Sequence, residues 1–499
     1  MVRQDSMIET QLPVLLILSY ILFALLVPAM GLFREQWAQP LATIGSGIAT
    51  SLSVYGFWHV LQHGTVRYFF GNWAPPIGIE FVYDGLSAFF VLIINSVGLM
   101  VLLHSAQTGR RELTTKRMPY YALTMLMLLG FNGMILTGDL FNLFVFLEIA
   151  SLAGYALIAI GDRPAPYAAF RYLIIGTVGG TLYLLGIGLL YTATGTLNMI
   201  DMATLLPEVA DHRSVIAALT LIVAGMGIKA ALFPLHGWLP DAYTFAPSVT
   251  SSLIAPIGTK VGAYVLFRIL YWVFGTSFLD GPVPVLEILA ILSGIGILFG
   301  SVMAIAQTEM KRMLAYSSVS QIGYILMGLS LANPWGFAGA LLHVLNHAIM
   351  KALLFMVSGH LQNKEGHSDI RRFHDAYRKK YPWTMAAFTV GAVSMVGLPP
   401  LAGFFSKWYL ALGTVENSNW ILLVVILISS LLNAVYFFRI LEKVYMTDPS
   451  KAQKEPGEGE YSEPGLSAMI PLLTLAGSLF VIGFANAAII GFLLNLYPF

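Results

Sequence analysis

The chain has 499 residues, of which 57% are hydrophobic and only 11% are charged. Soluble globular proteins carry about 25% charged residues, so this composition excludes a soluble enzyme and indicates a polytopic, all-α membrane protein. The net charge of +1 gives no reason to expect nucleic acid or another acidic partner. The absence of cysteine excludes disulfides, thiolate metal sites and cysteine-held iron–sulfur clusters in this chain, and we expect no metal or cofactor.

Hydrophobic segments long enough to cross a membrane recur along the whole chain. A spanning helix needs about 20 apolar residues, and fourteen segments satisfy this requirement. They are residues 11–33, 40–61, 84–105, 119–138, 141–162, 168–195, 213–233 continuing to 244 after a break, 247–274, 285–306, 313–332, 335–358, 382–412, 419–446 and 467–495. The irregular stretch 62–80 is expected to form a short hairpin around Gly71 and Asn72.

The basic residues between these segments favour one orientation. Loops that follow odd-numbered segments carry nineteen Lys and Arg residues, whereas loops that follow even-numbered segments carry two. Because Lys and Arg concentrate in cytoplasmic loops, both termini are predicted to lie outside the cell. The polar segment 447–464, rich in Glu, Lys and Gly, is then a solvated cytoplasmic loop.

Two proline breaks suggest an internal repeat. One interrupts the seventh segment at Ala231–Pro240, the other interrupts the twelfth at Val396–Lys407, and each has a lysine nearby. The two broken segments are five positions apart in the order of segments. Because five is odd, they cross the membrane in opposite directions, so we predict two inverted five-helix repeats. The expected parts are an N-terminal three-helix segment (1–110), a first repeat (111–275), a second repeat (276–446) and a cytoplasmic loop with the last helix (447–499).

A lysine and a glutamate stand out in the first half. Lys229 lies deep in its segment, five residues before Pro234, and His236 follows the break. A charge at the bilayer centre costs about 2.5–3.5 kcal/mol on insertion scales, so this stretch predicts an ion site, with snorkelling to the interface as the alternative. Glu148, in the fifth segment, is either a protonated carboxyl in a helix interface or a carboxylate that faces a lysine, for which Lys229 is the expected partner.

Further titratable residues line the second half. Lys260 lies among small residues and is expected to face a partner or a cavity. His343, His347 and Lys351 follow at four-residue spacing, which places them on one helix face. Such a stripe suits a proton relay, although ordinary hydrogen-bonded core residues are the alternative, and no carboxylate or thiol accompanies them to favour a metal. Lys407, after the second break, is expected to be the last charged group before the opposite membrane face.

Other conspicuous residues are expected to be structural. Asp84 is expected to cap the third segment, and Gly176 with Gly180 to form a small-residue packing motif. Charged residues near segment ends are expected to anchor the chain at the membrane surface or to set its topology: Asp241, Arg268, Lys311 and Arg312.

Several of these stretches together resemble a known family. The stretches are Phe146-Leu-Glu148, Gly227-Ile-Lys229, Phe233-Pro-Leu-His-Gly-Trp-Leu-Pro-Asp-Ala-Tyr243, Lys311–Gln321, His347-Ala-Ile-Met-Lys351 and Gly397-Leu-Pro-Pro-Leu-Ala-Gly-Phe404. They are similar to motifs of the antiporter-like subunits, which are the proton-pumping membrane chains of respiratory complex I and the large subunits of Mrp-type cation/proton antiporters. The resemblance implies a fourteen-helix fold with two inverted five-helix repeats. It also implies conducting roles for Glu148, Lys229, Lys260 and Lys407.

The resemblance implies a transporter subunit rather than an enzyme. The expected function is proton translocation, through a Glu, Lys and His relay, in a multisubunit monovalent cation (Na⁺)/proton antiporter. The expected partners are the other membrane subunits, including a larger A-type antiporter-like chain, in the plasma membrane of a prokaryote. The alternative is a proton-pumping subunit of an NADH-quinone oxidoreductase or a membrane-bound hydrogenase. It stays open because no residue in this chain distinguishes an antiporter subunit from a subunit of a redox-driven complex.

Overall fold

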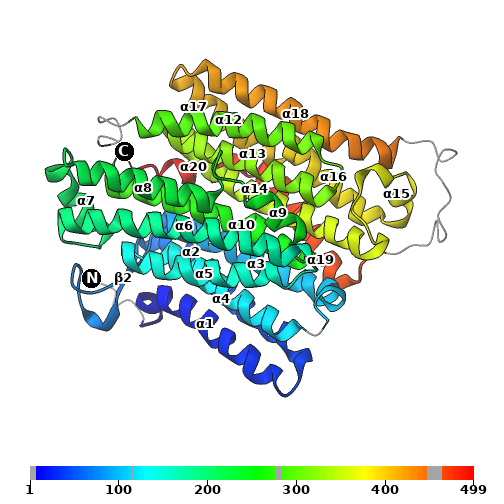
Figure 1. Cartoon of the computed structure of the whole chain (residues 1–499), viewed down its shortest axis with the longest axis horizontal. Helices are drawn as coiled ribbons and strands as arrows, with labels where there is room; N and C mark the ends of the chain where they lie inside the picture. The colour runs from blue at the N-terminus through cyan, green and yellow to red at the C-terminus, as the bar shows by residue number, and fades with distance from the viewer. Residues whose placement is uncertain (1–6, 115, 276–277, 279–283, 447–462, 499) are drawn as a thin grey trace.

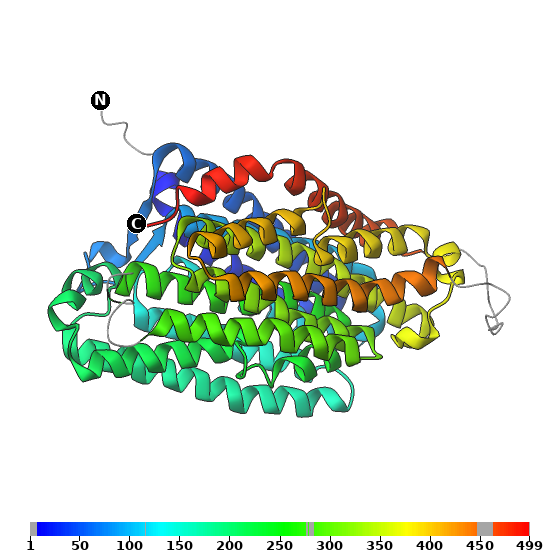
Figure 2. The same ribbon diagram turned by 90° about the horizontal axis from the view of Figure 1, so that it is seen from above.

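A computed structural model describes residues 7–114, 116–275, 278, 284–446 and 463–498. Within these residues the chain is a bundle of long helices that run side by side along the long axis of the molecule (Figures 1 and 2). A helix satisfies all of its own backbone hydrogen bonds, which a segment surrounded by hydrocarbon requires. The length and apolar composition of these helices identify a multi-span integral membrane protein. The predicted cytoplasmic loop 447–464 lies almost entirely outside the described residues.

The helices follow the hydrophobic segments of the sequence closely. The first half contains α1 (Met7–Gly31), α2 (Ala38–His63), α3 (Gly85–Glu112), α4 (Arg117–Leu136), α5 (Leu140–Ala159), α6 (Pro164–Thr194), α7 (Met199–Leu205), α8 (Arg213–Ala230), α9 (Leu239–Phe245) and α10 (Ser248–Phe267). The second half contains α12 (Val285–Ala306), α13 (Met310–Ser330), α14 (Pro334–Glu365), α15 (Ala376–Lys380), α16 (Pro382–Val396), α17 (Ala402–Glu416), α18 (Trp420–Tyr445), α19 (Leu466–Phe484) and α20 (Asn486–Leu494).

Eleven helices of the described chain are long and apolar enough to cross a membrane. They match eleven of the fourteen predicted segments, and the other three segments are also helical, as α2, α13 and the α16–α17 pair. α13 carries a row of inward-facing Ser and Gln side chains, which lowers its hydropathy although it is almost fully buried. The crossing of the membrane by these three elements, and the inverted repeats, stay predictions.

Both predicted helix breaks are present. α8 ends at Ala230, and α9 begins at Leu239, whereas α16 ends at Val396 and α17 begins at Ala402. The residue after each first half has a left-handed backbone conformation, with φ of 60° at Ala231 and 91° at Gly397. A helix end leaves carbonyl groups without intrahelical partners and carries partial negative charge. The two breaks therefore place hydrogen-bond acceptors inside the bundle.

The predicted hairpin and the predicted cap of α3 are confirmed. β1 (Val66–Phe69) pairs antiparallel with β2 (Glu80–Tyr83), and Asp84 forms a capping box with Ser87. Arg268, which the sequence suggested as a surface anchor, instead makes two hydrogen bonds of 2.6 and 2.8 Å to the Asp84 carboxylate. This pair ties the end of α10 to the start of α3.

α9, the short helix after the first break, is held by basic residues from both halves of the chain. Asp241 lies 2.5 Å from Arg171 of α6 and 3.3 Å from Arg312 of α13. Lys311 is only 2% exposed, and its Nζ donates a 2.6 Å hydrogen bond to the carbonyl of Ala246, just after α9. Lys311 is thus a buried contact residue in this structure, in addition to any influence that it has on topology.

We expect Arg268→Met to destabilise the protein by about 3 kcal/mol, because removing one member of a buried ion pair leaves the other charge without a partner. Adding Asp84→Asn should recover part of this loss, since asparagine still caps a helix but carries no charge. The check is thermal unfolding of the purified protein in detergent. The exposed Arg371–Asp369 pair supplies the control Arg371→Met, which should unfold at the wild-type temperature. Equal losses of stability in Arg268→Met and Arg371→Met would contradict the structural role of Arg268.

Candidate functional site

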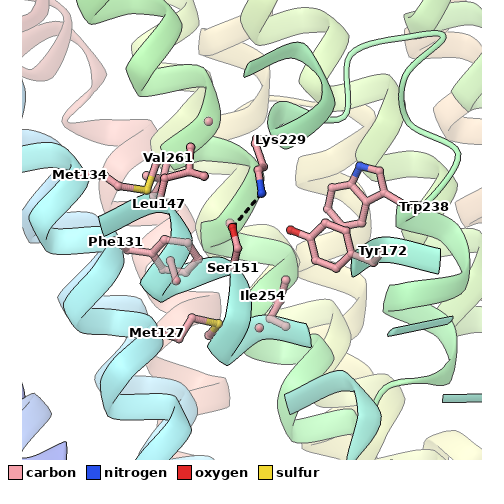
Figure 3. Close-up of a pocket in the computed structure, with 14 residues that line it drawn as sticks. Met127, Phe131, Met134, Leu147, Ser151, Tyr172, Lys229, Trp238, Ile254 and Val261 are labelled. Carbon is pink, nitrogen blue, oxygen red and sulfur yellow. Dashed lines mark hydrogen bonds between the residues drawn. The ribbon is translucent and has the colours of Figure 1, made fainter. Parts of the chain in front are cut away.

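Lys229 lies in the last turn of α8 and is 7% exposed. Its Nζ donates a hydrogen bond to the Ser151 hydroxyl at 2.8 Å (Figure 3). It donates a second to the Tyr155 hydroxyl at 3.3 Å, and both hydroxyls lie on α5. Glu148, Ser151 and Tyr155 are spaced at i, i+3 and i+7, so they share one face of α5. The lysine therefore meets a polar stripe that runs along the neighbouring helix.

Glu148 does not form a direct ion pair with Lys229. Among the described residues, no carboxylate oxygen lies within 4.0 Å of the lysine Nζ. The two groups are still close enough to attract each other electrostatically, and Ser151 lies one turn from Glu148 on the same face. The direct contact that the sequence suggested is therefore replaced, in this structure, by contacts to two hydroxyl groups.

Gly176 and Gly180 of α6 make room for the polar stripe of α5. A Cβ atom at position 180 would lie 2.5 Å from a Glu148 carboxylate oxygen, and one at position 176 would lie 2.1 Å from the Tyr155 hydroxyl. Both distances are shorter than the contacts that real Cβ atoms make with an oxygen atom, so a side chain at either position would clash. The small-residue motif is therefore more than a helix-packing surface, since it leaves space for two polar side chains beside Lys229.

A cavity of about 30 Å³ adjoins Lys229. Its walls come from α4, α5, α6, α8, the break and α10, and the lining residues drawn in Figure 3 include Phe131, Ser151, Tyr172, Trp238 and Val261. Trp238 stacks on Tyr172, with ring centroids 3.8 Å apart, and closes one side. A water molecule needs about 10–15 Å³ of such space, so the cavity has room for water between Lys229 and α10, the helix that carries Lys260.

Lys260 and Lys351 are also buried and held by uncharged oxygen atoms. The Nζ of Lys260 donates to the Ala255 carbonyl at 2.7 Å. The Nζ of Lys351 donates to the Leu314 carbonyl at 2.7 Å and to the Ser317 hydroxyl at 2.5 Å. The two amines influence each other electrostatically, and like charges repel strongly in an apolar interior. A proton on one of them therefore disfavours a proton on the other.

The two histidines of α14 differ in their partners. His343 lies 3.0 Å from the Ser406 hydroxyl through Nδ1 and 3.0 Å from the Gln321 amide oxygen through Nε2. An amide oxygen only accepts, so with this amide orientation Nε2 carries the hydrogen, and in the neutral ring Nδ1 accepts from Ser406. The ring of His347 is stacked 6.0 Å away and fully buried, and within the described part of the chain neither of its nitrogens has a hydrogen-bond partner.

Lys407, at the second break, reaches the end of α16. Its Nζ donates to the carbonyls of Met395 and Val396 at 3.1 and 3.0 Å and to the Ser430 hydroxyl at 3.3 Å. It also lies 5.3 Å from the centre of the Tyr324 ring. The negative end of the half-helix thus holds the ammonium group.

The eight candidate residues fall into three groups. Lys229 and Glu148 share the α5–α8 contact, whereas Lys260, Lys351, the two histidines and Lys407 form a second, connected set around α14. His236 belongs to neither, because its ring packs between Phe233 and Phe299 at centroid distances of 5.5 and 5.1 Å, and no described residue offers its Nδ1 a hydrogen-bond partner. Within the described residues, no three His, Asp or Glu side chains gather as a metal site would require.

The hydrogen-bond partners of these residues were not identified from the sequence. They are Ser151, Tyr155, Ser317, Gln321, Ser406 and Ser430. Ser151 and Tyr155 could have been found, because they lie on the helix face of Glu148. The partners on α13 and α18 lie far from the lysines in sequence, and only the packing of the helices brings them together.

Known proteins resemble this chain over most of its length. Residues 137–433 match the family described as NADH:quinone oxidoreductase/Mrp antiporter, TM. The N-type subunit of the NADH-quinone oxidoreductase of Desulforudis audaxviator is 48% identical over 434 residues, 85% of each chain. The D-type subunit of the Na(+)/H(+) antiporter of Alkalihalophilus pseudofirmus is 34% identical over 437 residues, 87% of this chain and 86% of that one. A chain of the membrane-bound sulfane sulfur reductase, an archaeal respiratory membrane complex, superposes with a TM-score of 0.89 at 32% identity, covering 98% of this chain and 97% of that one.

We expect Gly176→Ala to destabilise the protein by about 1–3 kcal/mol, because the new methyl group overpacks the site of the Tyr155 hydroxyl. Combining it with Tyr155→Phe should recover part of the loss, since the clashing oxygen is removed. Gly188→Ala is the matched control, because position 188 lies on the same helix and has no atom within 4 Å of an added Cβ. The measurement is the thermal unfolding temperature of all three variants. Equal unfolding temperatures for Gly176→Ala and Gly188→Ala would contradict the role of Gly176 in making room for Tyr155.

Proposed function

Because this chain belongs to the family of membrane subunits that NADH:quinone oxidoreductases and Mrp antiporters share, we propose that protons cross it along the buried Glu, Lys and His residues described above. It is a proton-translocating, antiporter-type subunit of a multisubunit membrane complex. The basic loops support an orientation with both termini outside the cell.

The observation that carries the proposal is that the four candidate lysines, like Lys311, are buried and held by uncharged oxygen atoms. Lys229, Lys260, Lys351 and Lys407 all lack a carboxylate within 4.0 Å among the described residues. A carboxylate in direct contact would hold a lysine permanently charged, whereas hydroxyl and carbonyl acceptors bind the ammonium without that constraint. Ionisable groups of this kind inside a membrane mark proton pathways.

Transfer begins where Lys229 meets the α5 stripe. Glu148 attracts the proton to this region, and the Ser151 and Tyr155 hydroxyls hold the ammonium in place. Water in the adjoining cavity carries the proton towards α10 and Lys260. A charge on Lys260 then repels positive charge on the α14 stripe, so protonation of one group favours release from the next.

The histidines carry the proton from the centre to the second break. When His343 gains a proton, both of its nitrogens become donors. The Ser406 hydroxyl must then accept from Nδ1, and its own hydrogen turns to the Gly403 carbonyl, which lies 3.2 Å away. Ser406 immediately precedes Lys407 in the chain, so this reorientation links the histidine to the last lysine. Neither nitrogen of His347 has a partner among the described residues, and Lys260 is near enough to act on the ring electrostatically, so His347 is the proposed acceptor of the proton from Lys260.

We assign the subunit to a monovalent cation (Na⁺)/proton antiporter, in the D position of an Mrp-type complex beside a larger A-type chain. The similarity to the D-type subunit of the Na(+)/H(+) antiporter supports this assignment. The second candidate is a proton-pumping subunit of a redox-driven complex, and the higher identity to the N-type subunit of the NADH-quinone oxidoreductase favours it. The proposed proton path through this chain is the same for both candidates.

Replacing Lys229 or Lys407 with alanine should lower proton transport about 100-fold or more, since each removes a proton carrier from the path. Glu148→Ala should have a similar effect, because the proton loses its electrostatic attractor. Transport is measured by the pH change inside everted vesicles that hold the assembled complex. The exposed Lys379→Ala is the control and should leave transport unchanged. Full transport in any one of the three variants would exclude that residue from the path.

Purification of the native complex with this subunit separates the two candidates. An antiporter complex should show no visible absorbance, whereas a redox complex should contain flavin or iron–sulfur absorbance in stoichiometric amount on its partner chains. The measurement is an absorbance spectrum of the intact complex, with subunit identity confirmed by mass spectrometry. A stoichiometric chromophore would replace the antiporter assignment with the redox assignment.

A further inference from the structure

We propose that the oxygen atoms around Lys407 form a binding site for a monovalent alkali cation, in which the lysine ammonium and the metal ion exclude each other. The inference rests on the proposed function, because it assigns a second ion to the last lysine of the path. It adds a substrate site within this chain, whereas the proton path alone needs only the lysine.

Four oxygen atoms surround the Lys407 ammonium. Two are the carbonyls of Met395 and Val396, and one is the Ser430 hydroxyl, at the distances of 3.0–3.3 Å given above. The fourth is the Asn433 amide oxygen, 3.1 Å from Nζ in the orientation of the amide that satisfies both of its ends. In that orientation the Asn433 nitrogen donates to the Tyr436 hydroxyl at 2.8 Å, and this hydrogen bond holds the amide so that its oxygen faces Lys407.

This set of ligands suits an alkali cation chemically. All four atoms are uncharged oxygens, and backbone carbonyls are the atoms that replace the water shell of such ions in selective sites. The two carbonyls lie at the C-terminal end of a broken helix, where the partial charge is negative, and transporters coordinate Na⁺ at such ends. A lysine ammonium is a compact point charge, so a cage that holds it can also hold a bare cation.

The cage differs from the surroundings of the other buried lysines. Among the described residues, Lys229, Lys260 and Lys351 each have two oxygen acceptors and Lys311 has one, whereas Lys407 has four from two separate helices. An ammonium group has three N–H donors, so a fourth oxygen is more than the lysine itself can use, whereas an ion without its water needs a more complete shell. The extra ligands therefore single out this position as the cation site.

The lysine can leave without moving the cage. The four ligands belong to α16 and α18, whereas Lys407 belongs to α17. The lysine stem passes over Gly397, where a Cβ would lie 3.1 Å from its Cδ, so no side chain stands in its way. Leu398, in the break after α16, is 42% exposed, so the break reaches the surface of the described chain. Loss of the proton from Lys407 thus leaves an oxygen cage next to this break.

Binding of radioactive ²²Na⁺ to the purified whole complex tests the site, with ⁸⁶Rb⁺ as a substitute for K⁺. Lys407→Met keeps an unbranched apolar side chain that ends one atom short of the ammonium position, and it removes the charge. At this site the variant should therefore bind an alkali ion about tenfold or more tightly than the wild type. Adding Ser430→Ala or Asn433→Leu to Lys407→Met should abolish the gain. Lys351→Met is the matched control, because it empties a two-oxygen site, and it should show no gain.

No gain in Lys407→Met, or the same gain in Lys351→Met, would overturn the proposal. A shift of the thermal unfolding temperature by NaCl, compared with choline chloride at equal ionic strength, gives a second readout if the yield of Lys407→Met is low. In this measurement too, no stabilisation of Lys407→Met by NaCl, or the same stabilisation of Lys351→Met, would overturn the proposal. The binding assay needs no transport, so a failure of the proton path in the Lys229→Ala experiment and a failure of the cation site are observed separately.

Discussion

The structure depends on how ammonium groups are accommodated inside an apolar helix bundle. Each buried lysine must meet oxygen atoms, because an unpaired charge in a low-dielectric interior is far more costly than an unpaired dipole. The chain meets this demand with hydroxyl groups and with backbone carbonyls, and carboxylates take no direct part among the described residues. The lysines are therefore satisfied but their charge is not fixed, which is the property that a proton carrier needs.

The helix breaks and the small residues follow from this demand. An unbroken helix uses its interior carbonyls for its own backbone hydrogen bonds, so Lys260 and Lys351 share carbonyls of this kind, whereas carbonyls without an intrahelical partner occur where a helix ends. The end of α16 supplies two carbonyls to Lys407. At the first break the same need is met from α5, and Gly176 and Gly180 provide the space in which the α5 side chains fit. Asp241, held by Arg171 and Arg312, keeps the short helix after that break in position.

Much of this architecture could be predicted from the sequence, because hydrophobic length, proline breaks and caps are local signals. The helices, the hairpin at residues 66–83 and the cap at Asp84 are confirmed. Helical spacing also identified the buried face of α14. Spacing shows which face is polar, but not which helix lies opposite. The acceptors of Lys229 and the burial of Lys311 therefore emerged only from the packing, and no local signal marked Gly180 as the neighbour of Glu148.

The two lysines at the breaks are not equivalent, and the difference would give the proposed proton path a direction. Lys229 has a carboxylate nearby and a cavity with room for water, so a proton is attracted to it and can leave it by water. Lys407 has no carboxylate within 4.0 Å among the described residues, and its cage consists of rigid helix ends and amide oxygen. A cage of this kind binds a positive charge without distinguishing a proton carrier from an alkali ion. Exchange of the two ions at Lys407 would then couple proton release to cation uptake within a single subunit.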